Sequence, residues 1–270
     1  MTGLNQDQVT PAADPGSRNL VTRIVVALVL APLALLIAWV GGPIWIGLVT
    51  LVTIGLFVEW LTIVGAARES WTIAAGIGAL AASGLCLALG HSDYALIVLA
   101  IGLVAVIATA RGERVWSVIG FCYAAAAELA SALVRLEGAY GFVALIFVLL
   151  VVWVTDSGAY FAGRAIGGPK LWPRVSPKKT WAGAIGGLVG SLAVAAGFAA
   201  FGFGKMVPLL LLGAILSVVS QLGDLFESAV KRRFGVKDSS QIIPGHGGLL
   251  DRSDALLVVS PLVYLYTVWM

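Results

Sequence analysis

Long apolar runs separated by short polar segments fill almost the whole chain. After a polar stretch over residues 1–19, the apolar runs lie at about 20–40, 43–64, 71–90, 94–110, 115–134, 140–162, 181–203, 206–227 and 254–270. Roughly 20 consecutive apolar residues in a helix are enough to cross the hydrocarbon core of a bilayer. Helices also satisfy their own backbone hydrogen bonds, which lipid cannot do. The pattern therefore predicts an all-α, polytopic integral membrane protein, a helical bundle of about nine transmembrane helices.

The composition favours a membrane protein over a soluble one. Of the 270 residues, 60% are hydrophobic and 11% are charged, whereas a soluble domain typically carries about 25% charged residues. Residues 1–19 contain Pro11, Pro15 and Gly16, and we expect them to form a disordered tail. The first apolar run is too long for a signal-peptide core and lacks a small-x-small cleavage site, so we interpret it as a retained first span.

Basic residues favour one side of the predicted bundle. If the tail is cytoplasmic, nine crossings place the C-terminus outside and four internal loops on the cytoplasmic side. These loops are 65–70, 111–114, 163–180 and 228–253. Arg135 and Lys205 lie on the opposite side, which leaves 15 of the 17 Lys and Arg residues on or beside the cytoplasmic side. Enrichment of Lys and Arg in cytoplasmic loops is typical of membrane proteins, and the two longest loops should emerge on the same face.

Acidic residues stand where the predicted spans meet these two long loops. Five of them lie at span ends: Asp156, Asp224, Glu227, Asp251 and Asp254. A carboxylate within a span costs about 2.5–3.5 kcal/mol on insertion scales and usually has a function or an ion-pair partner. Asp224 and Glu227 are three residues apart, as are Asp251 and Asp254, so each pair should share a helix face. Oxygen ligands at this density favour a hard cation, Mg²⁺ above all.

The same loops hold residues that suit phosphate groups. Arg binds phosphate oxygens in a bidentate manner and Lys binds them as a point charge. Gly245, Gly247 and Gly248 would let the backbone approach a phosphate closely. A Walker A motif is missing, because "GGPK" at 167–170 lacks its spacing. Simpler interpretations stay open, since basic loops can serve topology alone and His246 can cap a turn. Topology does not explain the acids, so the composition favours Mg²⁺-dependent phosphate chemistry at the cytoplasmic membrane surface.

A few polar or small residues inside the spans have more modest interpretations. Gly183, Gly187 and Gly190 form a small-residue face, which predicts tight helix packing along the seventh span. Glu59 and Glu128 also lie within spans, and we expect them to make contacts between helices.

The stretch SAVKRRFGVKDSSQIIPGHGGLLDRSD, from Ser228 to Asp254, closely resembles the signature of the phosphatidate cytidylyltransferases, also called CDP-diacylglycerol synthases. The matching positions are Ser228, Lys231, Arg232, Lys237, Asp238, Pro244, His246, Gly247, Gly248, Asp251, Arg252 and Asp254. The upstream DSGAYFAGR, RVSPKKTWAG and GDLFES also look like this family, and the resemblance is clearest over about 150–260. Two positions depart from it. Ser253 replaces a usually apolar residue, and Ala182 stands where the family commonly has Glu, so no role is assigned there.

The resemblance implies an enzyme that transfers CMP from CTP to phosphatidic acid, giving CDP-diacylglycerol and pyrophosphate in phospholipid biosynthesis. It implies Mg²⁺ held by Asp224 and Asp251, with a second, monovalent cation such as K⁺ sharing these acids. The residues expected to be catalytic are Asp224, Asp251, Lys231, Arg252 and His246. Those expected to bind substrate are Ser176, Lys178, Lys179, Ser228, Arg232, Lys237, Asp238, Gly247, Gly248, Asp156 and Asp254.

These interpretations divide the chain into three parts. They are a disordered cytoplasmic tail over 1–19, N-terminal transmembrane helices over 20–139, and a C-terminal catalytic transmembrane region over 140–270 with the cytoplasmic loops 163–180 and 228–253. The expected partners are CTP, phosphatidic acid and the lipid bilayer, and no nucleic acid; a homodimer stays open beside a monomer. The expected location is the bacterial inner membrane, with the N-terminus cytoplasmic and the C-terminus outside.

Two other functions stay open on chemistry alone. A CTP-dependent lipid or polyprenol kinase would need similar phosphate-binding residues. An ion-coupled transporter would also place acids within spans, although here they cluster at one face. A CDP-alcohol phosphotransferase is disfavoured because its Asp-x-x-Asp-Gly pattern is missing.

Overall fold

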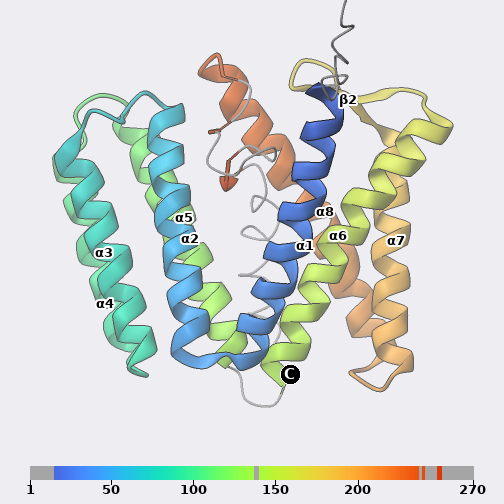
Figure 1. Cartoon of the computed structure of the whole chain (residues 1–270), viewed down its shortest axis with the longest axis horizontal. Coiled ribbons are helices and arrows are strands. Elements are labelled where there is room, and N and C mark those ends of the chain that lie inside the picture. The colour runs from blue at the N-terminus through green and yellow to red at the C-terminus, as the bar shows by residue number, and fades with distance from the viewer. Residues whose placement is uncertain (1–14, 137–139, 237–238, 241–247, 251–270) are drawn as a thin grey trace, which may run out of the picture.

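A computed structural model of the protein describes residues 15–136, 140–236, 239–240 and 248–250, with side chains from Leu28 onward. The described part is built from eight helices and one short hairpin (Figure 1). The helices are α1 (Pro15–Val40), α2 (Gly42–Ile63), α3 (Ser70–Ala88), α4 (Ser92–Thr109), α5 (Arg114–Leu136), α6 (Gly141–Ile166), α7 (Trp181–Ala200) and α8 (Met206–Arg233). The hairpin pairs β1 (Lys170–Trp172) with β2 (Ser176–Thr180) in antiparallel fashion.

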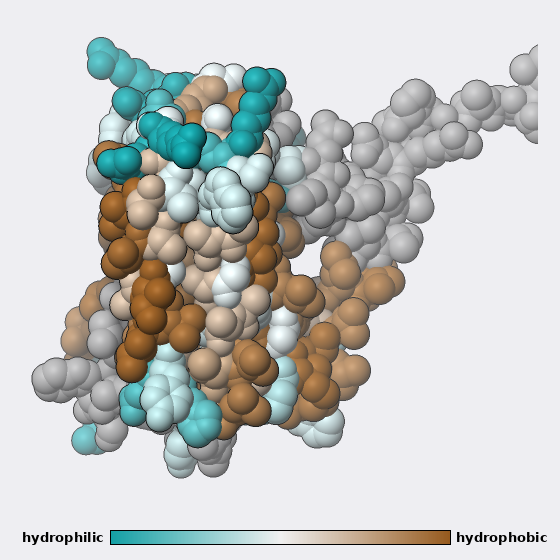
Figure 2. Space-filling view, turned by 90° about the vertical axis from the view of Figure 1, so that its left-hand side faces the viewer, coloured by the Kyte–Doolittle hydropathy of each residue, from teal (hydrophilic) through white to brown (hydrophobic). Residues whose placement is uncertain are grey.

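The helices have the length and surface of a membrane bundle. Seven of them, α2 to α8, are long and apolar enough to cross a membrane, and the described side chains of α1 continue the pattern over Leu28–Val40. Large apolar side chains such as Leu96, Ile101 and Val104 on α4 point outward. Figure 2 shows the result on one side of the molecule, where a hydrophobic band lies between hydrophilic ends. The predicted polytopic helical bundle is confirmed, and the ninth predicted span, 254–270, lies outside the described residues.

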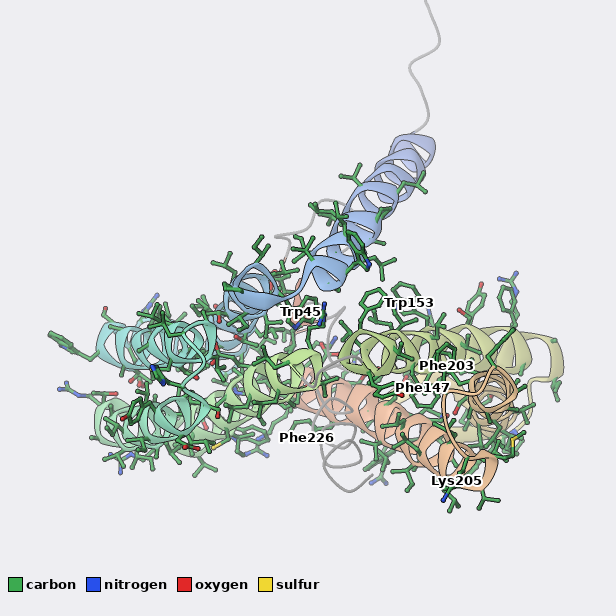
Figure 3. The ribbon with its side chains drawn as sticks, turned by 90° about the horizontal axis from the view of Figure 1, so that it is seen from below. Trp45, Phe147, Trp153, Phe203, Lys205 and Phe226 are labelled. Carbon is green, nitrogen blue, oxygen red and sulfur yellow. The ribbon has the colours of Figure 1, made fainter. Side chains whose placement is uncertain are left out.

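The helices gather into two groups, each around its own apolar core. Phe57, Leu80 and Phe121 are buried in the core of α2 to α5, and Phe147 and Leu216 in the core of α6 to α8. Seen from below, α1 projects away from both groups (Figure 3). The grouping separates an N-terminal helical unit from a C-terminal one.

Two sets of contacts join these groups. Val134 of α5 packs in the core of the second group, and Val230 of α8 packs in the core of the first. Trp60 of α2 stacks on Phe226 of α8 with the ring centroids 6.0 Å apart. Figure 3 shows Phe226 on α8 between the groups. The last turns of α8 are therefore held against the N-terminal helices.

The small-residue face predicted on α7 packs against α6. A Cβ atom at Gly187 would lie 2.7 Å from the Thr155 carbonyl oxygen, and one at Gly183 would lie 2.7 Å from the Ala159 oxygen. A Cβ atom at Gly190 would lie 2.8 Å from Cγ1 of the Val154 side chain. Only glycine lets the two backbones approach so closely, and the prediction of tight packing here is confirmed.

The loops with most of the basic residues share one end of the bundle. The α2–α3 and α4–α5 connections, the hairpin and the end of α8 all lie at the top of Figure 1. Glu69 joins two of these loops, because its carboxylate accepts hydrogen bonds from the Gly112 and Arg111 amides at 2.7 and 3.1 Å. Burial works against the charge, but these bonds, the Thr72 hydroxyl and the nearby Arg111 charge outweigh it and lower the pKa of Glu69.

Three helices, α1, α6 and α8, extend beyond the ends predicted for them, because polar residues next to the apolar run are also helical. Helix α1 begins at Pro15, so residues 15–19 of the predicted tail are helical; proline suits the first turn of a helix, where its missing N–H is not needed. Helix α6 continues to Ile166, into the predicted loop 163–180, and ends where Gly167 adopts a φ of 68°. Residues 170–180 then form the hairpin, which the sequence did not predict.

The predicted loop 228–253 likewise begins as helix. Helix α8 runs to Arg233, so Ser228, Lys231 and Arg232 are helical residues. Three basic residues in the last turn of α8 stabilise its C-terminal end, where the helix dipole favours positive charge.

Candidate active site

A cavity of about 550 Å³ opens beside the hairpin, between α6, α7 and α8. Its volume lies in the range of small-molecule sites, roughly 300–1,000 Å³. Five charged residues line it: Asp156, Arg164, Lys178, Lys179 and Asp224. They come from α6, β2 and α8, so three separate elements deliver charge to one space. Four residues predicted for the site from separate parts of the chain are thereby brought together: Asp156, Lys178, Lys179 and Asp224.

Asp224 of α8 and Lys179 of β2 form an ion pair in this cavity. The Asp224 side chain is 38% exposed and that of Lys179 is 26% exposed, so both remain in contact with solvent. Such a partly exposed pair adds little to stability. Its significance is chemical, because a carboxylate that already attracts an ammonium group can attract a metal cation in its place.

One face of α6 also lines the cavity. Asp156, Tyr160 and Arg164 follow one another at intervals of four residues, so they line up along the helix. The Arg164 guanidinium donates a hydrogen bond to the Tyr160 hydroxyl at 2.9 Å. The sequence predicted Asp156 as a site residue but not Tyr160 or Arg164, although the spacing of four residues was a usable signal.

The hairpin holds its lysines in place through the start of α7. Thr180 ends β2 and caps α7, accepting a hydrogen bond from the Gly183 amide at 3.1 Å. Lys170 pairs with Thr180 across the hairpin. Because a capping residue fixes the direction in which the chain enters a helix, Lys178 and Lys179 are directed along the cavity wall.

Asp224 and Glu227 have different surroundings, although they were predicted to share a helix face. Asp224 lines the cavity, whereas the Glu227 side chain is only 5% exposed and pairs with Lys231 on the next turn at 2.9 Å. Residues three apart are offset around a helix by about a sixth of a turn, and here the bundle buries one and leaves the other at the cavity. Lys231, predicted to meet phosphate, is itself mostly buried, at 14% exposed.

The other predicted site residues divide into two sets. Among the described ones, Ser176 and Ser228 are half-buried and Arg232 is exposed. The remainder lie outside the described residues: Lys237, Asp238, His246, Gly247, Asp251, Arg252 and Asp254. The meeting of Asp224 with Asp251 therefore stays a prediction.

Gly248 faces a carboxylate from the N-terminal helices. A Cβ atom there would lie 2.5 Å from a carboxylate oxygen of Glu59 and would also collide with the Ser239 hydroxyl. From the sequence, Gly248 was expected to let the backbone approach a phosphate, and Glu59 to make contacts between helices. The contact between them was missed because 189 positions of chain separate the two residues.

The residues of the cavity suit a hard divalent cation. Within the described part of the chain, no group of three or more His, Cys, Asp or Glu residues is placed to hold a metal ion. Mg²⁺ does not need such a group, since it is usually bound by one or two carboxylates together with waters and substrate phosphates. Asp224 offers a carboxylate beside cationic residues that suit phosphate, so this donor set fits Mg²⁺ bound together with a nucleotide.

Comparison with known proteins places the chain in a family. The profile of the cytidylyltransferase family matches residues 21–270, and the chain belongs to this family. The phosphatidate cytidylyltransferase of Brucella suis is 43% identical over 262 residues, covering 92% of this chain and 93% of the relative. That of Bacillus subtilis is 48% identical over 130 residues, covering 46% of this chain and 47% of the relative. The family resemblance of residues 228–254 is thereby confirmed.

Proposed function

We propose that this protein is a phosphatidate cytidylyltransferase, which transfers CMP from CTP to phosphatidic acid and releases pyrophosphate. The observation that carries the proposal is the cavity in which Asp156 and Asp224 stand among Arg164, Lys178 and Lys179. Two anionic phosphate compounds must be brought together in this reaction, and the three cationic side chains suit that task. The 43% identity to a phosphatidate cytidylyltransferase over nearly the whole chain supports the same reaction.

The position of the cavity suits substrates that come from two phases. It lies beside the hairpin, at the end of helices whose sides are apolar. CTP would enter from water, while phosphatidic acid would stay in the bilayer and present its headgroup at this depth. A site within the apolar band would exclude CTP, and a site far above it would not reach the lipid.

The chemistry needs alignment and charge neutralisation more than a strong base. A phosphate oxygen of phosphatidic acid, already ionised near neutral pH, attacks the α-phosphorus of CTP. A new P–O bond forms, the bond to the bridging oxygen breaks, and pyrophosphate leaves with the electron pair. Holding the two phosphates in line supplies much of the rate in such transfers. Lys178, Lys179 and Arg164 would hold them and offset their repulsion.

The metal site proposed here combines Asp224 with Asp251, shared with a second, monovalent cation such as K⁺. Asp251 follows Leu250 directly in the chain, and Leu250 is buried among the helices that also hold the end of α8. A Mg²⁺ ion, when bound, offsets negative charge on the pyrophosphate leaving group. On binding of the ion, Lys179 would exchange its pairing with Asp224 for one with a substrate phosphate.

The remaining predicted residues keep supporting roles in this proposal. Arg232, Lys237 and Arg252 would neutralise phosphate charge, and Ser176 and Ser228 would donate hydrogen bonds. His246 and Gly247 would shape the nucleotide pocket.

We also propose that the site faces the cytoplasm of a bacterial cell, with the protein in the inner membrane, the N-terminus inside and the C-terminus outside. The excess of Lys and Arg at the hairpin end supports this orientation, since cytoplasmic ends carry such an excess. CTP is a cytoplasmic nucleotide, which agrees with the same assignment.

The function is tested with purified protein, phosphatidic acid in mixed micelles, Mg²⁺ and CTP labelled at either the α- or the γ-phosphate. Label from the α-phosphate should enter the lipid product, and label from the γ-phosphate should appear in pyrophosphate. Transfer of the γ-label to lipid would show a kinase instead. Ion flux into liposomes without any nucleotide turnover would show a transporter.

A further inference from the structure

Helix α2 carries a buried carboxylate that binds a distant part of the chain. Glu59 is 2% exposed and lies one turn before the end of α2. Its oxygen Oε1 accepts hydrogen bonds from the Ser240 hydroxyl at 2.5 Å and the Leu249 amide at 2.9 Å. Its oxygen Oε2 accepts from the Ser239 hydroxyl and the Leu250 amide, both at 2.9 Å. Four donors that lie 180 to 191 positions away thus converge on one carboxylate.

The apolar surroundings of Glu59 hold the same segment. Leu250 is 1% exposed in the core of the first helix group. Leu249 packs against Gly55, because a Cβ atom at Gly55 would lie only 2.5 Å from Cδ1 of Leu249. Gly248 has no room for a side chain beside Glu59. Gly55 and Glu59 stand one helical turn apart, so a single face of α2 provides both a small gap and a charge for residues 248–250.

The partners of Glu59 explain why a charged group is buried there. A buried carboxylate is costly unless hydrogen bonds satisfy it, and two hydroxyls and two backbone amides do so here. The charge also stabilises two amides in a turn of chain that lies just before the last predicted span. The arrangement binds backbone, so it fixes the path of the chain more directly than a contact between side chains would.

We propose that Glu59 is a positioning residue for the cytidylyltransferase reaction. By fixing residues 248–250 against α2, it holds the chain directly before Asp251, the predicted second metal ligand. The proposal rests on the metal site of the proposed function. It gives the N-terminal helices a direct part in the site, although every charged residue that lines the cavity comes from α6, β2 or α8.

Glu59→Gln tests the need for a carboxylate at constant size. The amide keeps one acceptor oxygen but turns an NH₂ group toward two of the four donors. Loss of an outer residue that orients metal ligands typically costs about 10–100-fold in metal affinity or activity. We therefore expect the Mg²⁺ concentration for half-maximal activity to rise by about tenfold or more, with much of the turnover recovered at saturating Mg²⁺. An unchanged Mg²⁺ dependence would overturn the proposal.

A second measurement follows the segment itself without substrate or metal. Hydrogen exchange at the Leu249 and Leu250 amides should be slow in the wild-type protein and clearly faster in the Glu59→Gln variant. If Glu59→Gln does not fold, Ser240→Ala removes a single donor and should shift the Mg²⁺ dependence in the same direction by a smaller factor. Equal exchange and equal Mg²⁺ dependence in Ser240→Ala and wild type would then overturn the proposal.

Glu128→Gln is the matched control, since Glu128 is also a fully buried helix carboxylate but accepts its hydrogen bond from Thr50 at 2.7 Å. It should leave the Mg²⁺ dependence and the exchange of Leu249 unaltered. A rise in the Mg²⁺ requirement in both variants would show a general loss of stability and count against a positioning role. If wild-type protein makes no CDP-lipid at all, the proposed function fails, whereas the exchange result still reports on the Glu59 contacts.

Discussion

Asp224 is the residue on which the proposed chemistry depends most. It occupies the cavity, it is partly exposed, and Lys179 already compensates its charge. Its neighbour Glu227 is buried against Lys231 and is not available in the same way. At the scale of single residues, the fold thus assigns different tasks to two acids that the sequence presents as a pair.

Replacing Asp224 by Asn should remove the proposed metal ligand and its ion pair with Lys179, a partly exposed pair that adds little to stability. We expect Asp224→Asn to lower CDP-lipid formation by about 100-fold or more, because the loss of an outer residue that only orients metal ligands already costs about 10–100-fold. Size-exclusion chromatography in detergent should show a folded protein. Asp93→Asn, an exposed residue at the opposite end of the bundle, should leave activity unchanged. Near-normal turnover of Asp224→Asn at saturating Mg²⁺ would contradict the metal assignment.

At the scale of elements, the α6–α7 contact decides where the cavity forms. Asp156 and Arg164 are on α6, while the hairpin that carries Lys178 and Lys179 is fixed to the start of α7. The two helices approach closely because glycines line the contact. A small increase in their separation would therefore move the carboxylate of one element away from the lysines of the other.

Gly187→Ala should disturb this contact, since the added methyl group would lie 2.7 Å from the Thr155 carbonyl oxygen. We expect the free energy of unfolding to fall by roughly 1–3 kcal/mol, the usual cost of overpacking. This loss should appear as a lower midpoint of thermal unfolding in detergent, and activity should be reduced. The control is Gly197→Ala on the same helix, where nothing lies within 4 Å of the new methyl group. Equal midpoints for the two variants would show that the contact is not tightly packed.

At the scale of the whole molecule, charge is distributed unevenly between the two ends. The hairpin and the end of α8 place their basic residues together at one end, whereas Arg135 and Lys205 lie at the other. Arg135 there donates hydrogen bonds to the Ala38 and Trp39 carbonyl oxygens at the end of α1, at 2.5 and 2.9 Å. A structural contact of this kind explains why a basic residue occurs at the end predicted to face outward.

The orientation can be measured with single cysteines in a background where Cys86 and Cys122, both free thiols, are replaced by Ala. A membrane-impermeant thiol reagent should label Asp93→Cys in intact spheroplasts. It should label Arg174→Cys, an exposed position in the hairpin turn, only after the membrane is permeabilised. The opposite pattern would place the cavity outside and would be incompatible with a CTP-dependent enzyme.

The eight described helices, the clustering of basic loops at one end and the family could all be predicted from the sequence alone. Apolar runs and charge distribution are properties of the chain read in order, and a bilayer or an aqueous surface selects for them directly. The motif over residues 228–254 could be recognised for the same reason, since the spacing of its residues is read directly from the sequence. Helix ends were less predictable, because polar residues continue a helix whenever local pairs such as Glu227 and Lys231 stabilise it.

Which residues meet across long stretches of chain depends instead on how the helices pack in three dimensions. Asp224 pairs with Lys179 because α8 lies beside the hairpin, and Glu59 binds Ser239 because α2 lies beside the chain that follows α8. Neither partner can be read from spacing, since the choice depends on which helices become neighbours in the bundle. Packing of glycines and aromatic rings between the helices made that choice, and it brought Glu59 of the N-terminal half against the chain that follows α8.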